Sequence, residues 1–170
     1  MAGASITVDG SERALRQVSE AYEKIANPYE MFQELGVAMA ERVIERFDDS
    51  VDPEGNPWPV SLRVMTSQGG GKTLVDKALL RNSITSNATE HDVEIGTNVI
   101  YAAIHQFGGT IRPKSAKALA FNIPGIGFVQ TQAVNIPARP FLGFNDADKS
   151  EISKIAGEYL AAAFGERHAG

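Results

Sequence analysis

The sequence predicts an α+β fold with a mostly antiparallel sheet, and three observations lead to this prediction. Apolar residues recur at helical spacing in two stretches near the start of the chain and in one at its end. Short alternating segments between turn residues fill the second half, as in antiparallel strands. We find no internal repeat. This order of elements is typical of an α+β domain, and 170 residues suffice for one core, so we expect a single domain over residues 1–170.

Two helices are predicted near the start, after loose residues 1–10. The first covers residues 11–25. The second begins at Asn27-Pro28-Tyr29-Glu30, because Asn caps helices, Pro tolerates the first position and Glu30 is placed to close a capping box. It runs to about Phe47, and Gly36 indicates that another backbone comes close. The two apolar stripes are Leu15, Val18, Tyr22 and Ile25, and then Phe32, Leu35, Met39, Val43 and Phe47.

Residues 48–75 are predicted to form a long extended arm. Three prolines and the run Gly69-Gly70-Gly71 interrupt any periodicity, and a segment of this length without regular structure is too long for an ordinary connector. Fixing its backbone costs roughly 1–2 kcal/mol per residue, so we expect the isolated subunit to leave much of it mobile. Trp58 lies in this arm and needs burial. It either holds a neighbouring subunit or folds back on its own core, and both interpretations stay open.

The second half of the chain is expected to mix short helices with strands. Residues 76–81 are predicted as a short helix, and 83–88 lead through a turn at Glu90-His91-Asp92 into a strand over 93–95. The remaining elements are a helix over 99–104 capped by Asn98 and ended by Gly108-Gly109, strands over 119–123 and 128–134 joined by Pro124-Gly125-Ile126-Gly127, and a helix from the cap Asn145 to Phe164 before loose residues 165–170.

Composition excludes several classes of protein. The chain has no cysteine, which excludes disulfides, thiolate zinc sites and a thiol nucleophile. No apolar run approaches the roughly 20 residues that a membrane-spanning helix needs, so we expect no membrane association. The net charge is -5, which argues against a nucleic-acid binder that works by bulk charge.

Charge is unevenly distributed along the chain. Residues 1–50 carry five basic and ten acidic side chains, whereas no acid occurs between Glu94 and Asp146. The basic residues in that interval are Arg112, Lys114, Lys117 and Arg139. This basic middle either forms a surface that meets phosphate or an acidic neighbour, or is a neutral β-rich core segment whose few basic side chains extend to solvent. Both interpretations stay open.

No motif indicates catalysis, metal binding or cofactor binding. Gly71-Lys72-Thr73 looks like the end of a phosphate-binding loop, but Thr66 stands where that motif requires glycine. None of the three histidines has the partner at i+4 that a zinc-binding helix requires. We therefore expect no enzyme activity, no cofactor and no metal. The alternative is a small metal-dependent hydrolase that uses His105 with a carboxylate.

Four stretches together resemble the virion morphogenesis, or tail completion, proteins of Mu-like tailed bacteriophages. They are Arg46-Phe47 with Pro53-Glu54-Gly55-Asn56-Pro57-Trp58, Leu80-Arg81-Asn82-Ser83-Ile84 with Val93-Glu94-Ile95-Gly96-Thr97, Tyr101-Ala102-Ala103-Ile104-His105-Gln106-Phe107-Gly108-Gly109, and Ile136-Pro137-Ala138-Arg139-Pro140-Phe141-Leu142-Gly143. Their order and spacing span about residues 40–160. One departure is Lys77-Ala78, where the family often has Thr-Gly before the short helix.

The resemblance implies a structural virion protein that acts at the head–tail junction. Proteins of this kind look like the tail-terminator and neck proteins of tailed phages, which form rings, usually hexameric, around the DNA path. The implied partners are further copies of the chain, the tail tube protein and the head–tail connector protein, with DNA passing through without sequence-specific binding. The implied location is the virion, after assembly in the host cytoplasm. The alternative is a capsid or tail assembly factor that is absent from the finished particle.

Eight residues are candidate contacts with neighbouring subunits. A ring needs head-to-tail contacts that close, and the Trp58 arm and the stiff segment from Pro137 to Pro140 suit them. That segment presents Arg139 and Phe141, and interface centres favour arginine and aromatic residues. The opposite interpretation, with Phe141 in the core and Arg139 in a local ion pair, stays open. The eight residues are Trp58, Tyr101, Gln106, Phe107, Pro137, Arg139, Pro140 and Phe141.

Overall fold

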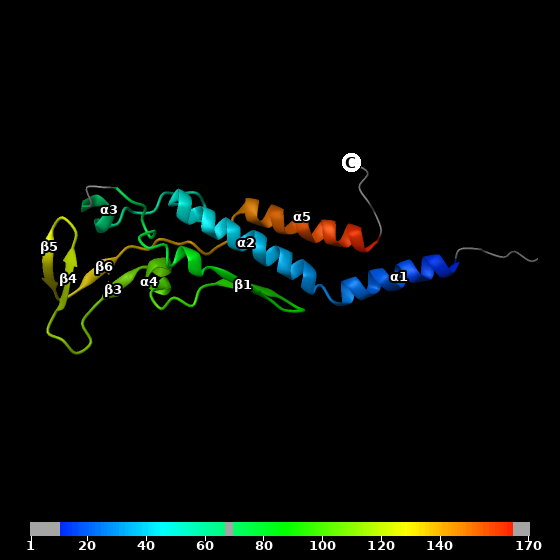
Figure 1. Cartoon of the computed structure of the whole chain (residues 1–170), viewed down its shortest axis with the longest axis horizontal. Helices are drawn as coiled ribbons and strands as arrows, with labels where there is room; N and C mark the ends of the chain where they lie inside the picture. Colours follow the sequence, from blue (N-terminus) through cyan, green and yellow to red (C-terminus); the bar gives the residue numbers. More distant parts are fainter. Residues whose placement is uncertain (1–10, 67–69, 165–170) are drawn as a thin grey trace, which may run out of the picture.

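The computed structural model describes residues 11–66 and 70–164, and it shows an elongated α+β molecule (Figure 1). Helix α2 (Tyr29–Asp49) runs along the long axis, and helix α5 (Asp146–Ala163) lies beside it. Helix α1 (Ser11–Ala26) extends beyond the start of α2 and contacts α5. Within the described ranges, the strands form three separate antiparallel pairs. The predicted α+β class is confirmed.

The first two helices begin close to the predicted positions. Pro28 occupies the capping position of α2 and no side chain caps the helix there, so the predicted capping box is wrong. Asn27 Oδ1 instead accepts a hydrogen bond from the backbone N–H of Tyr29 at 3.2 Å. The predicted loose ends, 1–10 and 165–170, lie outside the described residues. None of the described helices is both long enough and apolar enough for a membrane span.

The apolar stripe of α2 packs against strands β1 (Thr85–Ala88) and β2 (Val93–Gly96), which form an antiparallel hairpin. Gly36 is a point of very close approach. A Cβ at this position would lie 2.8 Å from Ser86 Oγ and 2.9 Å from a methyl group of Val93. The close contact predicted at Gly36 is therefore present, although side chains of the hairpin make it rather than a backbone. A larger residue here would push the hairpin away from the helix.

The core lies beside the last turns of α2. Phe47 is fully buried, and its ring centroid lies 5.4 Å from that of Trp58 and 5.2 Å from that of Phe141. Leu80 and Ile84 complete the cluster from the segment that follows the arm. Aromatic pairs at these distances stabilise a core by more than the burial of their apolar area alone would. Trp58 therefore folds back on its own core, which was one of the two interpretations left open.

The described part of residues 48–75 holds more regular structure than the sequence predicts. A tight turn closes through the bridge between Val51 and Pro57, and Asp52 accepts the backbone N–H of Asn56 at 2.8 Å. This turn directs Trp58 inward. Helix α3 (Leu62–Thr66) follows. The sequence does not reveal α3, because five residues are too few to show a helical period.

The helix predicted over residues 76–81 is wrong. The segment forms turns that lead into the 3₁₀ helix η1 (Arg81–Ser83). Ala78 has φ of 55°, in the left-handed region that a right-handed helix excludes. The turns let Arg81 reach back to Asp48 through two bonds, Nε to Oδ1 at 3.0 Å and Nη2 to Oδ2 at 2.6 Å. Tertiary contacts therefore replace the local helix.

Helix α4 (Ala102–Phe107) begins later than predicted. Thr97 Oγ1 accepts the backbone N–H of Val99 at 3.1 Å, and this side-chain turn occupies the place where Asn98 was expected to cap the helix. The predicted end is confirmed, because α4 stops at Gly108, whose φ is 68°.

Strands β4 (Leu119–Ile123) and β5 (Gly127–Thr131) form the predicted hairpin. The return strand is shorter than predicted, because the hydroxyl of Thr131 bonds to the backbone two residues later and ends the strand. Strand β6 (Val134–Ile136) follows and pairs with β3 (Gly109–Ile111). The sequence does not reveal this pair, since three residues show too little alternation.

Ala78→Gly is expected to stabilise the protein. A non-glycine residue in the left-handed region costs about 1–2 kcal/mol, whereas glycine adopts it freely and loses only about 0.5–1 kcal/mol of chain entropy on folding. The free energy of unfolding, measured by urea denaturation, should rise by about 0.5–1 kcal/mol. The control is Ala120→Gly in the extended strand β4, which should lower stability. A loss of stability in Ala78→Gly would show that the left-handed backbone at this position is not strained.

Candidate functional site

Residues 137–145, between β6 and α5, form a segment on which the rest of the molecule converges, and we call it the joint. It has no strand partner, and its prolines remove two backbone donors. Side chains from distant parts of the chain therefore satisfy its backbone groups. The indole Nε1 of Trp58 donates to the carbonyl of Pro140 at 2.8 Å. Asn145 Nδ2 donates in turn to the carbonyl of Pro53 at 2.6 Å, so the joint and the turn before Trp58 hold each other.

Gln106 of α4 bonds the joint through both atoms of its amide. Its Oε1 accepts from the backbone N–H groups of Phe141 and Leu142, both at 3.0 Å. Its Nε2 donates to the carbonyl of Leu142 at 2.8 Å. The N–H of Arg139 also donates to the carbonyl of His105 at 2.7 Å. Helix α4 thus makes the hydrogen bonds to the backbone of the joint that a neighbouring strand would otherwise make.

Arg46 of α2 and Asp148 of α5 form a buried ion pair beside the joint. Nη2 of Arg46 lies 2.5 Å from Oδ2 of Asp148, and the two side chains are 7% and 1% exposed. Nη1 of Arg46 donates to the carbonyls of Phe141 and Gly143, both at 2.9 Å. Nε of Arg42 bonds the other carboxylate oxygen of Asp148. Charge-assisted bonds of this kind are short and strong, so α2, α5 and the joint are held in one arrangement.

Asp148 also closes the capping box of α5. Oδ1 of Asn145 accepts the N–H of Asp148 at 2.8 Å, and Oδ2 of Asp148 accepts the N–H of Asn145 at 2.9 Å. The predicted cap at Asn145 is therefore confirmed. Burial by itself raises the pKa of Asp148, but the bonds from Arg42 and Asn145 and the charges of Arg46 and Arg42 outweigh it and hold the pKa below its ordinary value of 3.8.

The structure divides the eight candidate contact residues into two groups. The first is buried or half-buried in bonds and contacts within the chain, and consists of Trp58, Gln106, Arg139, Pro140 and Phe141. The second is exposed, and consists of Tyr101, Phe107 and Pro137. Phe141 lies in the core, as the opposite interpretation held, whereas Arg139 makes no ion pair with a described residue.

Arg139 lies in a pocket of about 250 Å³ that is lined from α3, α4 and the turns before η1. Its Nε donates to the carbonyl of Pro59 at 2.7 Å, and burial lowers its pKa. His105 lines the same pocket, and burial, followed by the charge of Arg139, lowers its pKa. The Nδ1 atom of His105 is buried and has no hydrogen-bond partner among residues 11–66 and 70–164.

These features give the hydrolase alternative no support. A catalytic histidine is oriented by a hydrogen-bonded carboxylate, and the described carboxylates make no bond to Nδ1 of His105. The described residues also contain no group of three His, Asp or Glu side chains placed to hold a metal ion.

Sequence reasoning missed the roles of Arg46 and Asp148. A signal existed for each. Arg46 lies on the apolar stripe of α2 between Val43 and Phe47, where an arginine needs a buried partner. Asp148 stands three residues after the cap Asn145, the position from which an acidic side chain closes a capping box.

Residues 9–161 match the phage virion morphogenesis family. The chain belongs to this family. Over 90 residues it is 37% identical to the Mu-like prophage FluMu G protein 2 of Haemophilus influenzae, covering 53% of each protein, so the chain spans about half the length of this curated relative. No solved structure matches the chain. Membership of the phage virion morphogenesis family gives the protein a structural or assembly role in the phage and associates it with the virion.

Asp148→Asn is expected to lower the free energy of unfolding by about 3–5 kcal/mol, because Arg46 then stays buried without its counter-charge. The wild-type protein should also lose stability in acid. Since the folded pKa of Asp148 is depressed, its contribution is fully present above the unfolded pKa near 3.8 and is lost as pH falls through the lower folded value. Urea denaturation from pH 7 to pH 3 measures both effects.

The matched control for this prediction is Asp146→Asn. Asp146 lies in the same first turn of α5, but its side chain is 98% exposed. Its loss should leave stability close to that of the wild type. Equal losses in the two variants, or an unchanged acid sensitivity in Asp148→Asn, would contradict the role given to the buried pair.

Gln106→Leu is expected to destabilise the protein by at least about 2 kcal/mol, because two N–H groups and one carbonyl of the joint lose their partner. Gln106→Glu is the matched variant, since it keeps an acceptor for both N–H groups and removes only the donor. Its loss of stability should be smaller. Thermal unfolding of both variants tests this order, and the reverse order would mean that the acceptor bonds contribute little.

Proposed function

We propose that the protein is a structural subunit for tail completion and head–tail joining. In this proposal copies of the chain assemble into a closed ring, expected to be hexameric, on the end of the tail tube. The ring caps the tube and docks to the head–tail connector, and DNA passes through it without sequence-specific binding. Membership of the family supports a role in virion morphogenesis. The observation that carries the ring is the exposure of apolar side chains at both ends of an elongated molecule.

Helix α1 presents an apolar stripe to solvent. Leu15, Val18 and Tyr22 are 67%, 66% and 68% exposed. The helix is nevertheless held in place, because the hydroxyl of Tyr159 on α5 donates to the carbonyl of Lys24 at 2.9 Å. α1 extends beyond the body of the molecule (Figure 1). A row of exposed apolar groups on a fixed helix is typical of a surface that another protein covers.

The opposite end of the molecule also exposes large apolar side chains. It is formed by α3 and the β4–β5 hairpin, and α4 lies farther toward the middle of the molecule (Figure 1). The exposed residues on these elements are Leu62, Met65, Phe107, Ile126 and Phe128. Because this surface differs from that of α1, contact between them joins unlike faces of two copies. Contacts between unlike faces repeat from subunit to subunit, and they generate a ring when the rotation closes.

Val18→Asp is expected to weaken self-association on purified tail tubes at least about tenfold, because it places a charge in an apolar contact. The melting temperature of the monomer should change little, since this side chain is exposed in the subunit. Sedimentation velocity and negative-stain imaging with tail tubes measure the assembly. Gln17→Asp is the control, because Gln17 is exposed beside the stripe but is not part of it.

Two outcomes decide between the alternatives. A chain that stays monomeric on tail tubes, combined with normal tails in a phage that lacks it, refutes the ring. A chain that assembles but is missing from purified virions by mass spectrometry is an assembly factor rather than a part of the finished particle.

A further inference from the structure

The pocket around Arg139 contains a buried positive charge that lacks a counter-charge. Arg139 is 5% exposed, and no carboxylate in the described part of the chain lies within 4 Å of its guanidinium. Asp76 lines the same pocket, but it pairs with Arg63 at 3.5 Å. Buried charges in folded proteins are ordinarily paired, since an isolated one is strongly unfavourable. Among the described residues the guanidinium of Arg139 therefore lacks a counter-charge, and an anion bound in the pocket would supply one.

One further group favours a carboxylate in this pocket. Lys77 lines the pocket and is exposed, so it extends the positive charge to the rim. Leu79 and Tyr101, which are also exposed, add apolar area to the rim beside the Arg63–Asp76 pair. A charged floor and a partly apolar rim fit a glutamate side chain, whose methylene groups lie behind its carboxylate.

The chain itself carries such side chains at its other end. Residues 46–81 and 97–144 hold nine basic and five acidic side chains, whereas 15–45, 85–96 and 146–163 hold five basic and thirteen acidic ones. The first set surrounds the pocket and forms one half of the long axis, and the second forms the other half (Figure 1). The molecule is therefore positive at one end and negative at the other, a pattern that steers unlike ends together.

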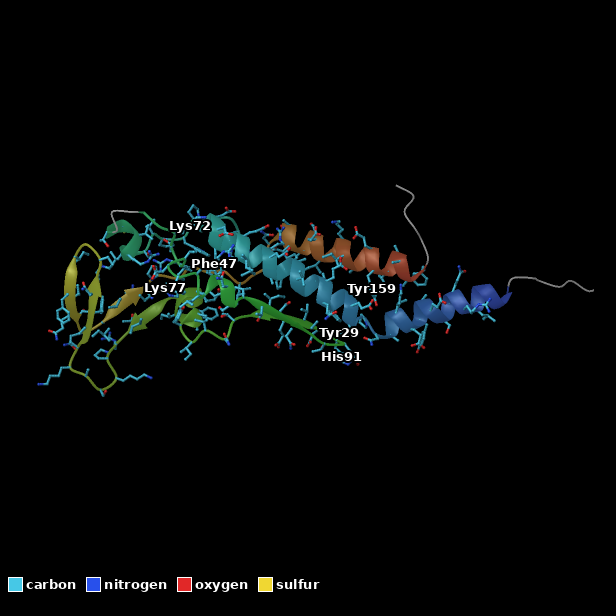
Figure 2. The ribbon with its side chains drawn as sticks, viewed as in Figure 1. Tyr29, Phe47, Lys72, Lys77, His91 and Tyr159 are labelled. Atoms are coloured by element: carbon cyan, nitrogen blue, oxygen red, sulfur yellow. The ribbon has the colours of Figure 1, made fainter. Side chains whose placement is uncertain are left out.

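In Figure 2, Lys72 and Lys77 lie in one half of the molecule, whereas Tyr29 of α2 and Tyr159 of α5 lie in the other half, with the two long helices. Helices α1 and α2 in the negative half carry exposed glutamates. They are Glu20, Glu23, Glu30, Glu34, Glu41 and Glu45.

We propose that the Arg139 pocket receives a glutamate side chain from α1 or α2 of a second copy of this chain. The proposal rests on the proposed function, because it names the contact through which neighbouring subunits of the ring recognise each other. The incoming carboxylate neutralises Arg139 and lies close to Lys77. The apolar stripe of α1 then provides most of the contact area between the two copies, and the pocket fixes their position relative to each other.

Photo-cross-linking tests the identity of the occupant. A benzophenone amino acid replaces Leu79 at the rim of the pocket, the full-length chain is assembled on tail tubes, and the cross-linked peptides are identified by mass spectrometry. The expected partner peptide comes from residues 15–45 of a second copy. The same probe at Ile111, exposed on β3 outside both the pocket and the apolar surface proposed to contact α1, is the control and should not label the same segment. Cross-links from position 79 to any other segment overturn the proposal.

Charge reversal tests the electrostatic part of the proposed contact between the pocket and the glutamate. Lys77→Glu should weaken assembly at least about tenfold, because it repels the incoming carboxylate. Lys114→Glu is the matched control, since it makes the same change on an exposed lysine of the basic half that does not line the pocket. Its effect should be several-fold smaller. Equal effects would mean that only the overall charge of this end matters, and the proposal fails.

The remaining outcomes separate this proposal from the proposed function. Normal assembly of Lys77→Glu, together with a rise in the melting temperature of the monomer in millimolar inorganic phosphate, assigns the pocket to a free anion and overturns the glutamate contact while the ring stands. A wild-type chain that never assembles on tail tubes overturns both.

Discussion

The buried pair between Arg46 and Asp148 is the interaction on which the rest of the structure depends. It joins the two long helices, α2 and α5, at the level of the joint, and the same guanidinium holds the carbonyls of Phe141 and Gly143. A buried pair is unfavourable unless its remaining donors and acceptors are satisfied. Arg42, Asn145 and the two carbonyls meet that condition here, so the pair specifies a single arrangement of helices and joint.

This arrangement explains why the stretches that carry the resemblance to phage morphogenesis proteins come from distant parts of the chain. Trp58, Gln106 and Phe141 all meet at the joint, where each fills a bond or a place in the core. Their first task is therefore to hold the fold. The surfaces available to other molecules lie elsewhere, on α1 and on the positive end of the molecule. The proposed ring needs both a rigid joint and unlike ends.

Arg139 connects these two tasks. Its backbone N–H belongs to the joint through His105, whereas its guanidinium lies in the pocket. The sequence pointed to Arg139 as a contact residue or as half of a local ion pair, and the local pair is absent among the described residues. Of the other predicted contact residues, some are buried and some are exposed. The sequence could not separate them, because the segment from Ile136 to Gly143 follows no strand or helix period that would show which side chains face inward.

The sequence alone determined the features that depend on near neighbours. The three long helices, the cap at Asn145, the end of α4 at Gly108 and the β4–β5 hairpin follow from periodicity, capping and turn residues. Only the tertiary structure decided the burial of Trp58, the turns at Ala78, the β3–β6 pair and the partners of Arg46 and Asp148. These features arise from contacts between residues that lie far apart along the chain, and such contacts produce no periodic pattern in the local sequence.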